Sequence, residues 1–371
     1  MGMFESELIN VTNIIQWKLA LSQFKDADIY HLPEYHLLAQ ARNEGDPFIF
    51  VYQKNGEYAA LPFLVRWVSD VGGLRDYLLC DATSVYGYPG ILTTLQEESN
   101  RVEDFKIGFQ SALIDALDKL KIIAFFSRTN PLFVTSWLLD GIADIITAGR
   151  TVVIDLTKPA SQQLKDISKG HKYDIREAKR NGVYVIEDHS FQYLDKFMAI
   201  YNETMQRVNS ASYYFFPKDY YIGLMKFLKN HIRVYFAKID QEFISAAIFF
   251  CNSGIIQYHL SGVFSKYVEL GGSKLIINEV REWGSKNGFK WLCLGGGLGS
   301  IDDHLFRFKA GFSKFRFPFQ MIRMVRDYSI YEELSLKHDK WLADNSFECM
   351  DKEYFPRYRA VYKKIEYDEE K

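Results

Sequence analysis

This chain of 371 residues has little of what usually identifies a protein at first sight. It has four cysteines, none of them in a CxxC pair, so we expect reduced thiols and neither a disulfide framework nor a metal site. No apolar run reaches the roughly 18 residues that a membrane-spanning helix needs. Acidic residues close to the N-terminus argue against a signal peptide, and we expect a cytoplasmic protein.

Strong net charge and hydrolase motifs are also missing. The formal net charge is only −2, which does not favour nucleic-acid binding driven by bulk charge. Neither G-x-S-x-G nor H-E-x-x-H occurs, so a covalent mechanism has no support. Hydrophobic residues make up 48% of the chain and charged residues 25%, which is the balance of a folded globular protein.

The sequence does contain a repeated order of expected elements. Residues 48–65 read as two strands around Asn55-Gly56, and residues 232–250 read as a second hairpin around Asp240-Gln241. In each half a short aromatic strand follows, and then an amphipathic helix that leads into another strand. The two expected helices lie over residues 102–120 and 271–287.

This order predicts the fold class. Hairpins are antiparallel, whereas a helical crossover makes neighbouring strands parallel. We therefore expect an α/β (α+β) protein in which a mixed, mostly antiparallel sheet flanked by helices is built twice. The expected segments are residues 1–149, residues 150–328, and a charged, partly helical tail over residues 329–371.

Two glycine-containing segments are candidate ligand sites. Gly271-Gly272-Ser273-Lys274 stands at an expected helix start, where backbone N–H groups and the helix dipole favour an anion such as a pyrophosphate. Residues 295–312 place three glycines after an expected strand, followed by Asp303, Arg307 and Lys309. The two cations would neutralise a phosphate or a developing negative charge. An ordinary turn, a helix cap and solvated charges are the alternative explanation for both segments.

Basic and aromatic side chains give further candidates. On an expected helix over residues 169–180, Lys172, Arg176 and Arg180 share one face, which suits phosphate or nucleic acid but is also favourable near any helix C-terminus. His259, on an expected strand, is either a general base or a structural histidine. The remaining candidates are polar or aromatic residues at turns and element ends, namely Tyr86, Tyr88, Arg128, Arg207 and Tyr214.

Four segments together resemble a known family. KGHKYDIREAKRNGV, YNETMQRVNSASYYFF, LGGSKLIINEVREWGSKNGFKWLCLGGG and LFRFKAGFSKF are similar to the FemABX-like branch of the GNAT acyltransferase superfamily, which includes BioF-type acetyltransferase domains. The resemblance covers about residues 25–325. It implies two tandem GNAT-like domains, in agreement with the repeat.

The resemblance also implies an activity. An acyl or aminoacyl group would pass from acyl-CoA (acetyl-CoA) or aminoacyl-tRNA, used as a co-substrate and not as a tightly bound cofactor, to an amine. The acceptor would be a sugar nucleotide or a lipid-linked cell-envelope (peptidoglycan) precursor, attacked directly in a ternary complex. The expected partners are this precursor and, as a candidate, tRNA, but not DNA; a peripheral membrane contact is compatible with this chemistry.

Site residues are carried over from the family's motifs. The donor-binding loop corresponds to Gly271, Gly272, Ser273 and Lys274, although Val268 stands where the family usually has a basic or amide residue. Lys309 matches the lysine of a Lys-x-Gly-Phe motif and is expected to stabilise the oxyanion or a phosphate. His259, Asp303 or a water molecule remains open as the base. The expected acceptor-binding residues are Arg128, Tyr86, Tyr88, Arg176, Arg207 and Tyr214.

Two alternatives remain beside an acyltransferase. One is a GNAT-fold protein without catalytic activity that binds an envelope glycan or nucleotide. The other is an RNA-binding module that uses the basic face over residues 169–180.

Overall fold

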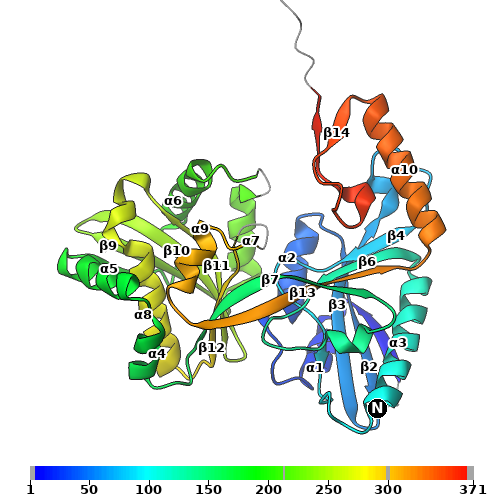
Figure 1. Cartoon of the computed structure of the whole chain (residues 1–371), viewed down its shortest axis with the longest axis horizontal. Coiled ribbons are helices and arrows are strands. Elements are labelled where there is room, and N and C mark those ends of the chain that lie inside the picture. The colour runs from blue at the N-terminus through cyan, green and yellow to red at the C-terminus, as the bar shows by residue number, and fades with distance from the viewer. Residues whose placement is uncertain (1–4, 212–213, 298–300, 366–371) are drawn as a thin grey trace, which may run out of the picture. The chain divides into compact units, whose positions relative to one another are not determined.

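The protein is described by a computed structural model that covers residues 5–211, 214–297 and 301–365 (Figure 1). Two compact units are formed. Unit 1 comprises residues 1–24, 30–147 and 319–371, and unit 2 comprises residues 25–29 and 148–318. The chain passes from unit 1 to unit 2 within strand β7 (Asp144–Asp155) and returns within strand β13 (Phe315–Val325).

Unit 1 is built on strands in the order β1-β2-β3-β4-β6-β13. The pairs are antiparallel except for β4 and β6, which are parallel and are joined through helix α3 (Val102–Lys119). The strands are β1 (Ser6–Asn10), β2 (Asp46–Lys54), β3 (Glu57–Trp67), β4 (Cys80–Thr83) and β6 (Ile122–Arg128), and a short β5 (Leu92–Thr93) pairs with β3.

Unit 2 has the order β7-β12-β11-β10-β9-β8. Its single parallel pair among the described strands is β11 with β12, joined through helix α8 (Gly272–Lys286). The strands are β8 (Tyr184–Glu187), β9 (Ile232–Ile239), β10 (Glu242–Asn252), β11 (Ile255–Val263) and β12 (Trp291–Gly295).

The two units therefore repeat one topology, which confirms the expected fold. Both expected hairpin turns are present, with Asn55 at φ 51° and Asp240 at φ 50°, in the left-handed region that Asn and Asp tolerate. The last strand of unit 1 comes from the second expected segment, since Met321–Val325 of β13 pair with β6. By contrast, Val152–Asp155 of β7 pair with β12 inside the continuous stretch 148–318 of unit 2. No local pattern indicates that β13 joins unit 1.

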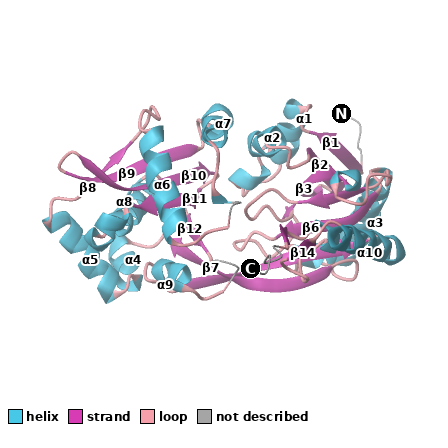
Figure 2. Ribbon diagram, turned by 90° about the horizontal axis from the view of Figure 1, so that it is seen from above, coloured by secondary structure: helices cyan, strands magenta, loops and turns pink. Residues whose placement is uncertain are grey.

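Helices flank the strands of each unit (Figure 2). In unit 2, Ala247 and Phe249 of β10 pack in one core cluster with residues of α8, α5 (Lys169–Arg180) and α9 (His304–Ala310). Because successive strand residues point to opposite faces, Ile248 lies on the other face, near α6 (Leu194–Arg207) and α7 (Lys218–Leu228). A short α4 (Ala160–Asp166) precedes α5.

The C-terminal residues are an integral part of unit 1, which differs from the separate tail over residues 329–371 that the sequence suggested. Helix α10 (Tyr328–Asp344) and the segment after it contribute Tyr331, Leu334 and Tyr358 to a core cluster with Val68 and Leu74. Helices α1 (Ile14–Leu21) and α2 (Pro33–Ala41) and the hairpin of β14 (Phe347–Cys349) and β15 (Tyr362–Lys364) complete this unit.

A buried carboxylate also ties this segment to the sheet. Asp81 of β4 is fully buried, and its carboxylate accepts hydrogen bonds from Arg66, at 2.7 Å, and from Arg359. Arg359 is 278 residues away in sequence. Since a buried charge needs partners, these contacts explain why the C-terminal segment packs here.

Candidate functional site

The parallel strands of unit 2 are paired only at their start. Ile255–Gln257 of β11 pair with Trp291–Cys293 of β12, whereas β11 continues to Val263. Strand β12 has a bulge after Cys293 and ends at Gly295 with φ 77°. Within the described residues, the edge of β11 beyond Gln257 therefore has no strand partner. Such an edge offers backbone hydrogen-bonding groups to a ligand.

The ammonium group of Lys309, a residue of α9, lies at the end of β12. Its Nζ donates a hydrogen bond of 2.7 Å to the carbonyl of Gly296, which follows the last residue of that strand. Burial lowers the pKa of Lys309 to about 8, and the Asp303 carboxylate offsets part of this effect. Asp303 caps α9, accepting a bond of 2.8 Å from the N–H of Phe306. The structure thus brings Lys309 and Asp303 together on one helix.

His259 lies on the other face of the sheet. Its Nε2 is 2.6 Å from the Tyr220 hydroxyl of α7, and its ring centroid is 4.2 Å from that of Phe250. The preceding Tyr258 packs with Phe249 in the cluster that contains α8 and α9. His259 is consequently not grouped with Lys309. Its partner Tyr220 could not be identified from the sequence, since nothing near this tyrosine points to a site.

The expected donor loop lies at the start of α8. Gly271 has φ 69°, and no side chain caps the helix, so the backbone N–H groups of its first turn receive no side-chain acceptor from a cap residue. Gly272, however, is buried against the sheet, and a Cβ there would lie 2.8 Å from Ser245 Oγ. Lys274 forms an ion pair with Asp174 of α5. Packing therefore accounts for Gly272 and Lys274 without a ligand.

The remaining parts of this loop are more open. Ser273 is half-buried in the first turn of α8, and Val268, in the short 3-10 helix before Gly271, is 45% exposed. Arg207 contacts the same region, donating to the Val263 carbonyl at 2.8 Å and to Ser265 Oγ at 3.1 Å. Its guanidinium therefore holds the segment that leads into the loop, and its expected contact with an acceptor stays a prediction.

Three expected acceptor residues lie together in unit 1. The N–H of Gly90 donates to the carbonyl of Arg128 at 2.9 Å, so the loop that carries Tyr86 and Tyr88 is fixed to the end of β6. The Tyr88 ring lies 5.1 Å from that of Phe319, and the Tyr86 carbonyl accepts a bond of 2.9 Å from a tyrosine hydroxyl of α2. The Arg128 guanidinium lies over an aromatic ring of its own strand, 5.6 Å from the centroid.

The basic face of α5 is less available than its sequence indicates. Arg180 pairs with Glu177, and Lys172 Nζ donates to the Leu164 carbonyl at 3.3 Å. Arg176 is exposed on the same helix. Tyr214, also expected at the acceptor, is half-buried in unit 2, where its N–H donates to the Ala211 carbonyl at 3.0 Å.

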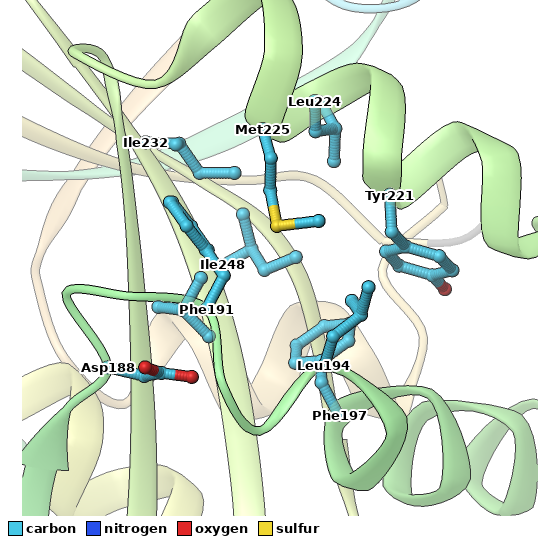
Figure 3. Close-up of a pocket in the computed structure, with 10 residues that line it drawn as sticks. Asp188, Phe191, Leu194, Phe197, Tyr221, Leu224, Met225, Ile232 and Ile248 are labelled. Carbon is cyan, nitrogen blue, oxygen red and sulfur yellow. The ribbon is translucent and has the colours of Figure 1, made fainter.

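A small pocket lies beneath α6 and α7 and is almost entirely apolar (Figure 3). Leu194, Phe197 and Met225 line it, and the Tyr221 hydroxyl points away from Met225. Asp188 at its margin accepts backbone N–H bonds, including one of 2.9 Å from Tyr193. Since its polar group is engaged by the backbone, this pocket has no polar features of an active site.

The described residues offer neither a metal centre nor a membrane span. They contain no group of three or more His, Cys, Asp or Glu side chains arranged to hold a metal ion. In the same residues, no helix combines the length and apolar character that crossing a membrane requires.

Comparisons with known proteins find a family match over part of the chain. Residues 140–243 match the model of the FemAB family. No curated protein matches the sequence. The structure of FemX has a TM-score of 0.69 at 10% sequence identity, covering 89% of this chain and 99% of that one.

Two further solved structures are similar in fold. For L-PGS from Bacillus licheniformis, the TM-score is 0.52 at 14% identity, with 86% of this chain and 95% of that chain covered. For the C-terminal domain of a putative lysylphosphatidylglycerol synthetase from Agrobacterium fabrum, it is 0.51 at 14% identity, with 89% and 96% covered. At such identities the likeness concerns the fold. Together with the family match, it confirms the expected resemblance.

Proposed function

We propose that the chain is a FemAB-like acyltransferase of the GNAT superfamily, which the family match and the fold support. Its reaction would be the acylation of an amine of a sugar nucleotide or cell-envelope precursor. The donor would be acyl-CoA or aminoacyl-tRNA. The observation that carries this proposal is the placement of Lys309, whose ammonium is held by the Gly296 carbonyl at the end of β12. The unpaired edge of β11 belongs to the same parallel strand pair.

The chemistry needs a cation where negative charge develops. The acceptor amine attacks the carbonyl carbon of the donor ester or thioester, a C–N bond forms, and the carbonyl oxygen becomes an oxyanion. The bond to the leaving thiolate or alkoxide then breaks, the leaving group takes up a proton, and the nitrogen loses one. With a pKa of about 8, Lys309 is mostly charged at pH 7, and as an ammonium it stabilises the oxyanion or a donor phosphate. Its lowered pKa also suits it to protonate the leaving group.

Proton removal from the amine requires another group. Asp303 is engaged in capping α9, which leaves it poorly placed to act as a base. His259, paired with Tyr220, and water are the remaining candidates from this chain and its solvent. We assign donor phosphates to the uncapped start of α8 at Gly271 and Ser273, because backbone N–H groups there favour an anion.

We place the acceptor's phosphate and sugar at Arg128, Tyr86 and Tyr88 of unit 1. The hydrogen bond from the Gly90 N–H supports this assignment, because it fixes the tyrosine loop to the strand end that carries the arginine. A guanidinium binds phosphate in a bidentate manner, and tyrosine rings stack on sugars and bases.

Donor binding is the first test. The protein is titrated with acetyl-CoA and longer acyl-CoAs while its Tm is followed, because a ligand of the native state raises the Tm in a concentration-dependent manner. Saturable binding supports acyl-CoA as the donor. Without it, transfer from charged tRNA to an amino-sugar nucleotide is assayed by mass spectrometry. Failure of both donors would refute the acyltransferase and favour a binding protein without catalytic activity.

Lys309→Ala tests the mechanism. We expect kcat to fall by roughly 100-fold or more with a smaller change in KM, as for the loss of one oxyanion-stabilising group. Lys314→Ala is the matched control, because Lys314 lies close in sequence but its side chain is 76% exposed. An unchanged kcat in Lys309→Ala would remove this lysine from the mechanism.

A further inference from the structure

The start of α5 holds the end of α9 at two points. The backbone N–H of Ser168, the N-cap of α5, donates to the Gly311 carbonyl at 2.8 Å. The Nε2 of His171 donates to the Phe308 carbonyl at 2.7 Å, across 137 residues of sequence. Ser168 Oγ in turn accepts from the His171 N–H at 3.2 Å, which fixes the histidine in the first turn of its helix. The Gly311 carbonyl at the helix end thereby gains a partner, and the Phe308 carbonyl accepts the His171 bond in addition to one of 3.3 Å from the Gly311 N–H.

The imidazole also explains the residues after Lys309. A Cβ on Gly311 would lie 2.3 Å from His171 Nε2, so the absent side chain is what admits the ring. Phe312 is fully buried, and its ring meets the imidazole edge-on, with centroids 4.7 Å apart at 74°. In the run Lys309-Ala310-Gly311-Phe312, the glycine and the phenylalanine therefore both fit His171.

We propose that His171 is a positioning residue, which sets Lys309 in place through the Phe308 carbonyl and the close fit to Gly311. Lys309 follows Phe308 directly, so a bond that fixes the Phe308 carbonyl also fixes the backbone that carries the lysine side chain. The far end of that side chain is held by the Gly296 carbonyl. This inference rests on the proposed function only in giving Lys309 a catalytic role, because the contacts themselves involve no substrate.

The hydrogen bond from His171 Nε2 to the Phe308 carbonyl is expected to persist around neutral pH. A carbonyl accepts only, so Nε2 carries the proton in this contact. Burial lowers the pKa of His171, and nearby Lys274 acts in the same direction, whereas the bond to Phe308 and the charge of Asp174 act against it. The ring is therefore neutral at pH 7, with its proton on Nε2.

The test measures the pKa of Lys309 directly and needs no substrate. The protein is labelled with 13C-lysine, the Lys309 resonance is assigned by its loss in Lys309→Arg, and its chemical shift is followed with pH. In His171→Gln the amide nitrogen reaches the position of Nε2, so we expect the pKa to stay near the wild-type value of about 8. In His171→Asn the shorter side chain cannot reach Phe308. Water then reaches the amine, and the pKa should rise by about one unit or more towards its ordinary value.

Activity supplies the second readout. We expect kcat of His171→Asn to fall about 10-fold or more with KM little changed, and His171→Gln to recover most of it. His231→Ala is the matched control: its Nδ1 also meets a backbone carbonyl, that of Cys251 at 3.2 Å, in the same unit but on the segment between α7 and β9. It should leave both the Lys309 pKa and kcat unchanged.

Gly311→Ala provides an independent variant if His171→Asn does not fold. Alone, it should displace the imidazole and raise the Lys309 pKa, and in a His171→Ala background it should have no further effect. A folded His171→Asn protein with an unchanged Lys309 pKa would overturn the inference. A shifted pKa in a protein that transfers no acyl group would instead leave the positioning intact and refute the proposed function.

Discussion

Adding a single methyl group at Gly272 tests whether this glycine at the start of α8 is needed for packing or for binding a ligand. In Gly272→Ala the new Cβ would lie 2.8 Å from Ser245 Oγ, 3.0 Å from Ile244 Cδ1 and 3.2 Å from Ala237 Cβ. Overpacking of this kind costs about 1–3 kcal/mol. Alanine regains up to about 1 kcal/mol of helix propensity, and less at the first helical position. The net loss should be about 1–2 kcal/mol.

The loss should appear as a fall in Tm of roughly 2–8 °C for a unit of this size, measured by calorimetry. Gly170→Ala is the control, because Gly170 lies in α5 and a Cβ added there would have no atom within 4 Å. That variant should be neutral or slightly stabilising.

A double-mutant cycle identifies the contact. Ser245 Oγ is buried without a hydrogen-bond partner, so Ser245→Ala should cost little by itself. It also removes the nearest atom, and Gly272→Ala should then be less harmful by about 1 kcal/mol. If Gly272→Ala left the Tm unchanged but abolished donor binding, the packing argument would be wrong, and the glycine would serve the ligand.

Three other predictions concern charged side chains. Arg359→Met leaves the buried Asp81 with one guanidinium and should cost about 3 kcal/mol in urea unfolding, and a loss under about 1 kcal/mol would contradict the role given to this contact. The folded-state pKa of Lys309 lies below its unfolded value of 10.5, so its charge opposes folding below pH 8, and this cost disappears as the pH rises to 10.5. Lys309→Met should therefore stabilise the protein by about 1–3 kcal/mol at pH 7 but not at pH 10.5, and equal effects at both pH values would argue against a buried ammonium. Arg128→Ala should raise KM for the acceptor about 10-fold and leave donor binding unchanged, whereas a defect confined to the donor would contradict its assignment.

The repeated topology could be predicted because its signals are local. Asn55-Gly56 and Asp240-Gln241 determine hairpin turns within a few residues. The place of β13 in unit 1 could not be predicted, since a strand's own residues do not specify which of two similar sheet edges it joins. Likewise, the charged character of α10 suggested a tail, and the contact that ties the segment after it to Asp81 spans 278 residues of sequence.

The candidate residues of the site come from local motifs, whereas their grouping depends on the fold. Lys309 and Asp303 stand six residues apart on one helix, and the structure places them together. The sequence also makes His259 a candidate base, but alternation along β11 turns its side chain towards α7. Which face a strand residue takes depends on the helices that cover the sheet, and this information is not contained in the strand.

The role of a glycine is the feature of this site that the sequence specifies least. Gly272 and Gly311 both stand in motifs that resemble ligand loops, and at each position the space of the missing side chain is taken by another residue of the same unit. Ser245 occupies it at the start of α8, and His171 occupies it at the end of α9. Gly271 differs, since its φ of 69° gives a conformational reason for glycine. A glycine that admits a protein side chain and one that admits a ligand look alike in sequence. They are distinguished by variants that remove the side chain packed against the glycine, such as Ser245→Ala for Gly272 or His171→Ala for Gly311.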